Sequence, residues 1–201
     1  YPIGASAPWI DTYELYYPKD DTINGLWNAD DNLSRATAVR ELNNGYNLIY
    51  HFDHGGIYQL STASVEGQGC LYRFDADNLS NSQKPSIIIT PACSPNAYDH
   101  NCFSRHLMSN NNGGAVAFIG NTRVGLGDQD VQYETFLWQR YDAHDYCIGS
   151  IFSSMQIAGV NSYYYYYAIA LLGDPTMLVW SHEQDTYNAV HQATFGLSDS
   201  L

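Results

Sequence analysis

The sequence contains few basic residues. Only 8 lysines and arginines stand against 21 aspartates and glutamates, so the formal net charge of the 201 residues is −13. Nucleic-acid binding needs a clustered basic face that neutralises phosphates, and attachment to anionic lipid needs basic segments. The composition therefore disfavours both a nucleic-acid partner and an anionic membrane surface.

Long apolar runs are missing as well. No stretch approaches the ~20 uninterrupted apolar residues of a membrane-spanning helix, because Asn161 and Ser162 interrupt the apolar segment 157–172. The first residue is Tyr1, and the opening segment lacks the charged and apolar regions of a signal peptide. We therefore expect no membrane span, and we expect an upstream part of the same precursor.

Cysteine is scarce too, since the chain has only Cys70, Cys93, Cys102 and Cys147. Their irregular spacing does not form a disulfide framework, although one pair could still form. Lysine is rare, whereas the chain has 18 tyrosines and an acidic balance. This composition is typical of extracellular proteins, and we expect a secreted or cell-surface location.

Helical and strand patterns alternate along the chain. Such alternation is typical of βαβ units, so an α/β fold with a mostly parallel sheet is expected. Apolar residues recur at helical spacing over 33–42, after Asn32 or Ser34 as the N-cap and before Gly45. Strands are expected over 46–52, 86–90, 115–120 and 176–180, and helices over 101–111, largely over 133–158, and over 163–172.

Two chemically capable residues follow the expected strands. His54 comes after the strand at 46–52, and Cys93 comes after the strand at 86–90. Ligands of open α/β sheets bind beyond the carboxyl ends of the strands. The separation of 39 positions, from 54 to 93, fits two strands with one crossover, so both side chains could meet at one edge of the sheet.

These residue types suit acyl transfer. A thiolate at Cys93 is a nucleophile, and the imidazole of His54 can take the thiol proton and return it to a leaving amine. The backbone N–H groups of Gly55 and Cys93 are candidate donors to the oxyanion. A cysteine and a histidine at strand ends also occur without catalysis, so the residues alone leave a structural role open.

Four blocks of sequence carry a family resemblance. In order and spacing they resemble the catalytic subdomain of the gingipain-type cysteine peptidases, which belong to the caspase-like clan. The resemblance covers roughly residues 13–180. The blocks are YNLIYHFDHGG (46–56), IIITPACSPNAYDHNCFSRHLM (87–108), GGAVAFIGNTRVGLGD (113–128) and YYAIALLGDPTMLVW (166–180).

The resemblance implies a caspase-like three-layer sandwich, with a mostly parallel sheet flanked by helices, in an incomplete domain. Residues 1–180 would be the catalytic subdomain and residues 181–201 a C-terminal extension. Cys93 would be the nucleophile and His54 the general acid and base, with Gly55 and Cys93 lining the oxyanion site. The implied function is that of a secreted cysteine endopeptidase, a hydrolase that works through an acyl-enzyme.

A specificity pocket follows from the same resemblance. With Ile119-Gly120 as the anchor of the alignment, Asp130 or Asp128 occupies the loop that selects a basic P1 side chain in lysine-specific relatives. Asn121 is counted with them as a substrate-binding residue. The same acidic loop could instead be solvated or bind structural calcium, while the chemistry itself requires no cofactor.

Two features depart from the family pattern. The family usually has Gly-His-Gly-Ser where this chain has Asp53-His54-Gly55-Gly56. The third, acidic member of the site comes from an earlier part of the family's domain, which we expect on a companion fragment of the same precursor. The natural partner is otherwise a protein or peptide substrate.

Other interpretations stay open. Within the family, the enzyme could be a sortase-like transpeptidase that processes a secretion signal. A catalytically silent structural module of a surface assembly is the alternative from another class. His51 is expected to be a satisfied core or interface histidine. A zinc site is less favoured, because the spacing of its candidate ligands matches no compact zinc finger. The candidate ligands are Cys93, His100, Cys102 and His106.

Overall fold

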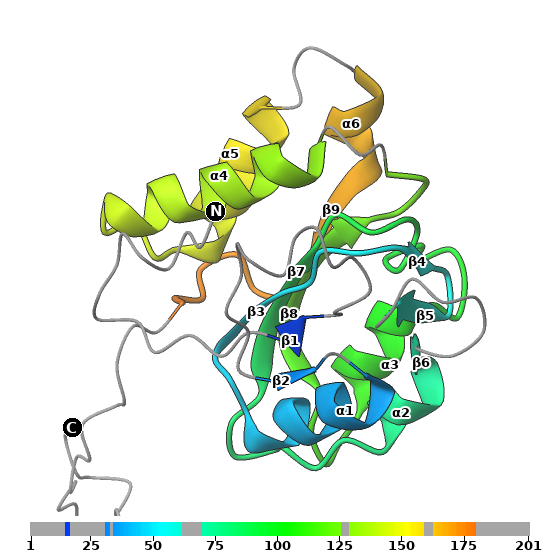
Figure 1. Cartoon of the computed structure of the whole chain (residues 1–201). Coiled ribbons are helices and arrows are strands. Elements are labelled where there is room, and N and C mark those ends of the chain that lie inside the picture. The colour runs from blue at the N-terminus through cyan, green and yellow to red at the C-terminus, as the bar shows by residue number, and fades with distance from the viewer. Residues whose placement is uncertain are drawn as a thin grey trace, which may run out of the picture.

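A four-stranded sheet forms the centre of the fold (Figure 1). The computed structural model describes residues 15–16, 31–32, 34–61, 70–125, 129–158 and 163–179. The strand order is β3-β7-β8-β9, in which β3, β7 and β8 are parallel and β9 runs antiparallel to β8. These strands are β3 (Leu48–Tyr50), β7 (Ser86–Thr90), β8 (Ala115–Asn121) and β9 (Ile169–Leu172).

Helices cover both faces of this sheet, so the fold has three layers. One face packs against α1 (Arg35–Asn44), α2 (Arg73–Asp77) and α3 (Phe103–Ser109). The other face packs against α4 (Gln129–Asp142) and α5 (Ile148–Ala158), which lie side by side. The short helix α6 (Tyr163–Ala168) leads directly into β9.

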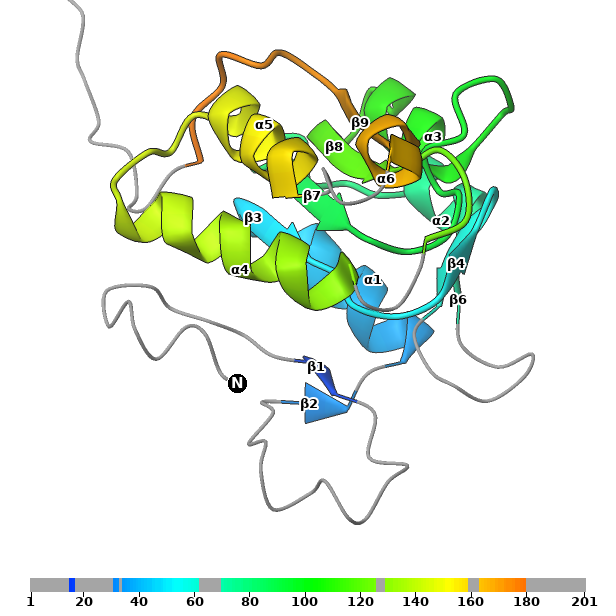
Figure 2. The ribbon, with the colours of Figure 1, turned by 90° about the horizontal axis from the view of Figure 1, so that it is seen from above.

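Two smaller sheets accompany the central one. The first is antiparallel and consists of β4 (Gly55–Gly56), β5 (Gln59–Ser61) and β6 (Cys70–Tyr72). The second is a parallel pair of β1 (Leu15–Tyr16) and β2 (Asp31–Asn32), which lies apart from the central sheet on the side of α1 (Figure 2).

The side chains of β7 explain the layers. Ile88 packs with α1, α2 and α3, whereas Ile87 and Ile89 pack with α4 and α5. Successive side chains of a strand point to opposite faces, so a continuous apolar run serves a strand that is buried on both sides. Full burial of one such side chain stabilises the fold by roughly 1.5–3 kcal/mol.

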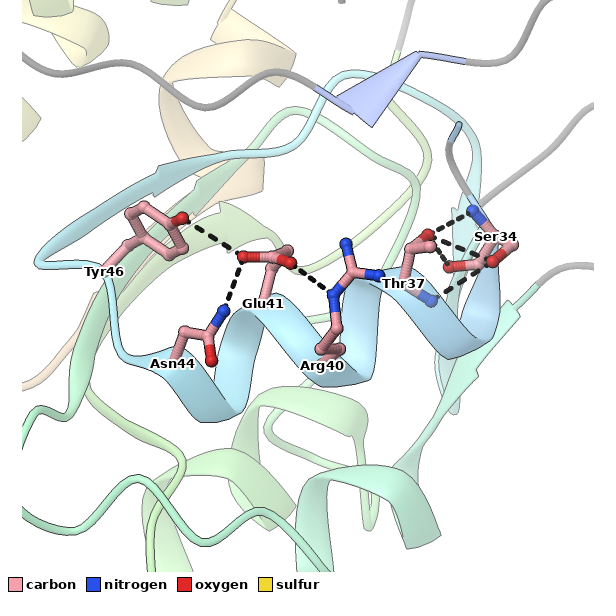
Figure 3. Close-up of polar contacts among 6 residues, drawn as sticks. All are labelled: Ser34, Thr37, Arg40, Glu41, Asn44 and Tyr46. Atoms are coloured by element: carbon pink, nitrogen blue, oxygen red, sulfur yellow. Dashed lines mark hydrogen bonds and ion pairs between the residues drawn. The ribbon is translucent and has the colours of Figure 1, made fainter. Parts of the chain in front are cut away.

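Both ends of helix α1 are capped, and Figure 3 shows the cap at the N-terminus. Ser34 is the N-cap, because its hydroxyl accepts a hydrogen bond from the Thr37 N–H and the Thr37 hydroxyl accepts one from the Ser34 N–H. Gly45 closes the helix at a φ of 79°, a left-handed conformation that glycine adopts without strain. The helix leads directly towards β3.

The buried carboxylate of Glu41 joins α1 to the segment that follows it. It accepts hydrogen bonds from Arg40 Nε (2.6 Å), Asn44 Nδ2 (2.8 Å) and the Tyr46 hydroxyl (3.1 Å) (Figure 3). Burial raises the pKa of Glu41, but these three hydrogen bonds outweigh burial and lower it. The ionised carboxylate is therefore part of the folded structure.

Most of the predicted elements are present. The helix at 33–42, the buried strand at 86–90 and the strand at 115–120 are confirmed by α1, β7 and β8. The strand predicted over 46–52 is shorter and only half-buried, since β3 pairs with β7 alone among the strands of the described chain. The sheet is mostly parallel, as expected.

The C-terminal part of the prediction was wrong. The helix expected over 163–172 ends at Ala168, because the next four residues pair with β8 as strand β9. In the segment 176–180, where a strand was expected, the described residues 176–179 form only an isolated bridge between Leu178 and Cys147. Both segments are apolar, and apolar runs of this length suit a helix or a strand equally.

The ends of the chain bear on two further predictions. Residues 1–14 and 180–201 lie outside the described residues, and so does the expected extension over 181–201. In the part of the chain that is described, no helix is both long and apolar enough to cross a membrane.

Candidate active site

His54 lies between β3 and β4. Its backbone N–H donates to the Asp53 carboxylate (2.6 Å), and its carbonyl accepts from the Ser61 N–H (2.8 Å). The Asp53 carboxylate thus binds the backbone of His54. The side chain of His54 is exposed to solvent, at the edge of the sheet where the parallel strands end.

Gly55 brings this loop against the loop that follows β7. A β-carbon at position 55 would lie 2.8 Å from the Ala92 β-carbon and 3.4 Å from the Cys93 carbonyl oxygen. A β-carbon does not approach another β-carbon so closely, so only glycine fits here without a shift. The segments that carry His54 and Cys93 are therefore in direct contact.

The thiol of Cys93 is half-buried beside a third loop. The Gly125 N–H donates to Sγ at 3.3 Å, and Sγ donates to the Gly125 carbonyl at 3.7 Å. The next residue, Ser94, has a φ of 63°, and its N–H donates to the Arg123 carbonyl (2.9 Å). A positive φ is uncommon for a residue other than glycine, and such residues cluster at functional sites.

Asn96 braces the loop that carries Cys93. Its buried amide donates to the carbonyls of Ala170 (2.9 Å) and Gly120 (3.4 Å), and its Oδ1 accepts from the Ser104 hydroxyl (2.7 Å). Its backbone N–H donates to the Asn121 carbonyl (3.1 Å). One side chain therefore ties this loop to β8, to β9 and to α3.

Asn121 acts from the end of β8. Its buried amide donates to the Pro91 carbonyl at 2.5 Å, and its Oδ1 has no hydrogen-bond partner within the described structure. Its side chain thus supports the segment just before Cys93, while a part in substrate binding stays a prediction.

An ion pair crosses the outer rim. The guanidinium of Arg123 binds both carboxylate oxygens of Asp99, at 3.1 and 3.0 Å. The hydrogen bond from Arg123 lowers the pKa of Asp99, which stays ionised at neutral pH. The pair joins the loops after β7 and β8 on their solvent side.

Sequence reasoning missed the contribution of His51, although it predicted a satisfied histidine. Its Nδ1 lies 2.8 Å from the Thr90 hydroxyl, and its Nε2 lies 2.8 Å from the Ser61 carbonyl. A carbonyl only accepts, so Nε2 carries the hydrogen of the neutral ring and Nδ1 accepts from Thr90. The ring of His51 therefore connects β5 to β7, and this connection can be recognised only once its hydrogen-bond partners are known.

The two acidic residues predicted for the pocket lie wholly or partly outside the described part of the structure. Asp130 belongs to α4, but its side chain lies outside the described structure, and so does the whole of Asp128. Their part in recognising a basic side chain stays a prediction.

The zinc ligands considered above have other partners. Cys102 is buried, with Sγ 3.2 Å from the Ser104 hydroxyl, and His106 Nδ1 lies 2.6 Å from the Asp77 carboxylate. Within the described ranges, no group of three or more histidines, cysteines or acidic residues is placed to hold a metal ion. Cys93, Cys102 and Cys147 are all free thiols.

Fold and site together define an α/β protein of the caspase-like type, with a cysteine and a histidine on touching loops at the carboxyl edge of its sheet. The model of peptidase family C25 matches residues 3–180. The chain therefore belongs to peptidase family C25. None of the curated proteins compared with the chain matches it.

Solved structures show the same fold. The chain is similar to gingipain R, an Arg-specific cysteine proteinase, with a TM-score of 0.61 and 19% identity over 76% of this chain and 38% of that one. It is similar to the complex of the Porphyromonas gingivalis RgpB pro- and mature domains, with a TM-score of 0.63 and 16% identity over 86% and 49%. The chain is also similar to a structure described as a protease, with a TM-score of 0.61 and 18% identity over 71% of this chain and 37% of that one. The chain thus spans less than half the length of each.

Proposed function

We propose that the chain is the catalytic part of a secreted cysteine endopeptidase, with Cys93 as nucleophile and His54 as general acid and base. The observation that carries the proposal is the packing of Gly55 against Ala92 and the Cys93 carbonyl, because it brings together the loops that hold the two reactive side chains. Membership of a peptidase family supports the same assignment.

The proposed reaction has two steps. The thiol proton passes to His54 as Sγ bonds to the peptide carbonyl carbon, and the C–N bond then breaks as His54 returns the proton to the leaving amine. Water next hydrolyses the thioester and restores the thiol. No cofactor takes part in this chemistry.

The developing oxyanion needs donors. We assign this role to the backbone N–H groups of Gly55 and Cys93, which belong to the two touching segments. Loss of one such donor costs roughly 2.7–4 kcal/mol of transition-state stabilisation in comparable enzymes.

The basic P1 preference belongs to the same proposal. A carboxylate at Asp130 or Asp128, with Asn121 nearby in sequence, would bind the cationic end of a lysine or arginine. Gingipain R, which shares the fold, is an Arg-specific proteinase, and this lends support to a basic substrate.

A companion segment of the same precursor is the proposed partner. One similar structure is a complex of pro- and mature domains, and the chain spans only 49% of the chain matched there. Strand β3 is only half-buried, so it offers one place where such a segment would extend the sheet.

The reactivity of the thiols tests the proposal. Cys93 and Cys147 are both half-buried, so Cys147 is an internal reference for simple accessibility. We expect iodoacetamide at neutral pH to label Cys93 much faster than Cys147 in the folded chain, as followed by intact mass and peptide mapping. The His54→Ala variant should lose this difference, and Cys93→Ala should fold but not turn over peptides.

Equal and slow labelling of both thiols would contradict the endopeptidase proposal. That result would favour the silent structural module. If the thiol is reactive and an acyl-enzyme forms, a comparison of water with added amine as acceptor separates a hydrolase from a transpeptidase.

A further inference from the structure

His51 connects the two halves of the proposed dyad. Its Nε2–H donates to the Ser61 carbonyl, and the N–H of Ser61 donates to the His54 carbonyl. Its Nδ1 accepts from the Thr90 hydroxyl, and Thr90 Oγ1 accepts from the Ala92 N–H at 3.1 Å. Each arm ends at the residue before Cys93 or at His54 itself.

We propose that His51 is a positioning residue that fixes the His54 loop and the Cys93 loop relative to each other. The inference rests on the proposed function. An imidazole suits this position because its two nitrogens are held by one planar ring, so the arms cannot move independently. The neutral ring also offers one donor and one acceptor, as the two partners require.

The backbone supports the same connection. The His51 N–H donates to the Ile89 carbonyl at 3.0 Å, which extends the pairing of β3 with β7 by one residue. The ring therefore starts from a fixed point on the sheet. Because the backbone of His51 is paired with β7, its ring holds both loops in a fixed position relative to the sheet.

Protonation would reverse the hydrogen bond between His51 and Thr90. Burial lowers the pKa of His51, against the opposing effects of the Ser61 carbonyl and the Asp53 charge, so the ring is neutral at neutral pH. A second proton on Nδ1 would make this nitrogen a donor to Thr90 Oγ1, which would then accept from both Nδ1 and the Ala92 N–H, while the Thr90 hydroxyl hydrogen would lose its acceptor. The hydrogen bonding of the Cys93 arm would therefore change, whereas the Ser61 arm would keep its donor.

Three variants test the proposal. Thr90→Val removes only the Cys93 arm at nearly constant volume, His51→Leu removes both arms, and His51→Gln keeps an amide that can donate to Ser61. We expect the first two to lower the iodoacetamide labelling rate of Cys93 about ten- to hundredfold, by misplacing the loops, while the rate of Cys147 stays unchanged. His51→Gln should recover part of the rate.

The pH profile provides a readout that a purely structural histidine would not move. We expect the acid side of the Cys93 labelling profile to contain a component that His51→Gln lacks. A native labelling rate of Cys93 in Thr90→Val and His51→Leu, or an equal slowing of Cys147 in these variants, would overturn the proposal. If His51→Leu does not fold, Thr90→Val and His51→Gln decide.

Amide hydrogen exchange separates this proposal from the proposed function. If Cys93 is unreactive in the unmodified chain, the endopeptidase proposal fails, but the exchange of Ser61 and Ala92 still reports the two arms. Faster exchange at both amides in His51→Leu supports the positioning role. Unchanged exchange at both refutes it.

A separate observation concerns the substrate. Val124 is 55% exposed and lies next to Gly125, whose N–H contacts the Cys93 thiol. Standard backbone geometry places the Val124 Cα within about 6 Å of Sγ. The partly exposed Tyr164 of α6 binds the same loop, because its hydroxyl donates to the Val124 carbonyl at 2.9 Å.

We infer that Val124 and the Tyr164 ring form a subsite for a large apolar side chain of the peptide substrate, close to the scissile bond. This inference also rests on the proposed function. Binding sites for small ligands are lined mainly by apolar and aromatic groups, and here an exposed valine and a tyrosine belong to or bind the loop that contacts the candidate nucleophile. The occupant is therefore a phenylalanine- or leucine-like residue of the substrate.

Binding without turnover tests the subsite. The Cys93→Ala chain would be titrated calorimetrically with acetylated octapeptides that carry one Phe, or one Ser, at successive positions. We expect one Phe position to improve binding about tenfold, and Val124→Ser to remove that gain. Leu178→Ser is the matched control, since Leu178 is 54% exposed and lies elsewhere.

The absence of a favoured Phe position, or a gain that survives Val124→Ser, would overturn the subsite. Because this readout needs no catalysis, it is independent of whether Cys93 is reactive. Tyr164→Phe, which loses only the hydroxyl, should weaken the favoured peptide less than Val124→Ser does.

Discussion

Gly55 lies so close to Ala92 that a β-carbon added to the glycine would be 2.8 Å from the β-carbon of the alanine. This contact joins the loop after β3 to the loop after β7. No side chain fits at position 55, so the close spacing of the two loops requires glycine there.

Gly55→Ala is therefore expected to reduce the reactivity of Cys93 strongly, because the added methyl pushes the two loops apart. The neighbouring Gly56→Ala is the control, since its β-carbon would meet only the Gln59 side chain at an ordinary 3.8 Å. Labelling rates of Cys93 in both variants measure the effect. Equal rates in the two variants would show that the close contact has no bearing on the site.

Asn96→Ala is expected to destabilise the fold. The substitution removes the hydrogen bond from the Asn96 amide to the Ala170 carbonyl and the one from the buried Ser104 hydroxyl to Asn96 Oδ1, which costs about 1–3 kcal/mol in the free energy of unfolding. Urea unfolding measures this loss. Asn112→Ala, at an exposed position, should change little, and a similar loss there would argue against the bracing role of Asn96.

Glu41→Gln should lower stability at neutral pH, by about 1–2 kcal/mol for the loss of charge-assisted hydrogen bonds. Because the folded protein holds the pKa of Glu41 below its ordinary value of 4.5, the carboxylate stabilises the fold above that pH and loses its effect as the pH falls. Thermal unfolding of both proteins between pH 7 and the acid range checks this. A constant difference across the range would reject the ionised carboxylate as its cause.

Asp130→Asn is expected to depress cleavage after lysine or arginine selectively, because the amide lacks the charge that pairs with a basic P1 side chain. The ratio of kcat/KM for basic and apolar P1 peptides is the measurement. Asp142→Asn, at the exposed end of α4, is the control. Unchanged selectivity in Asp130→Asn would remove this residue from the pocket.

The sequence was most informative where one local pattern had one structural solution. Three consecutive isoleucines at 87–89 predict a strand that is buried on both faces, and a serine–glycine pair around an amphipathic stretch predicts the ends of α1. The segment 163–172 was different. Its last four residues became a strand only because β8 offered an edge, and no local pattern contains that information.

The candidate site shows the same division. Its two reactive residues could be named from strand ends and from a family resemblance, whereas the bracing by Asn96 and Asn121 depends on partners up to 74 residues away. A single sequence does not show which buried carbonyl an asparagine will find.

The alternation of Ile87, Ile88 and Ile89 has a consequence for chemistry. A slip of one residue between β7 and its neighbours would exchange the two hydrophobic layers and shift Cys93 along the sheet by about 3.3 Å. Packing of the isoleucines in the two layers opposes such a slip. The side chains of Ile87, Ile88 and Ile89 therefore help to keep the thiol and the imidazole aligned, although they lie in the core, away from the proposed substrate site. Core substitutions in β7 should therefore appear first as lost reactivity, before the chain unfolds.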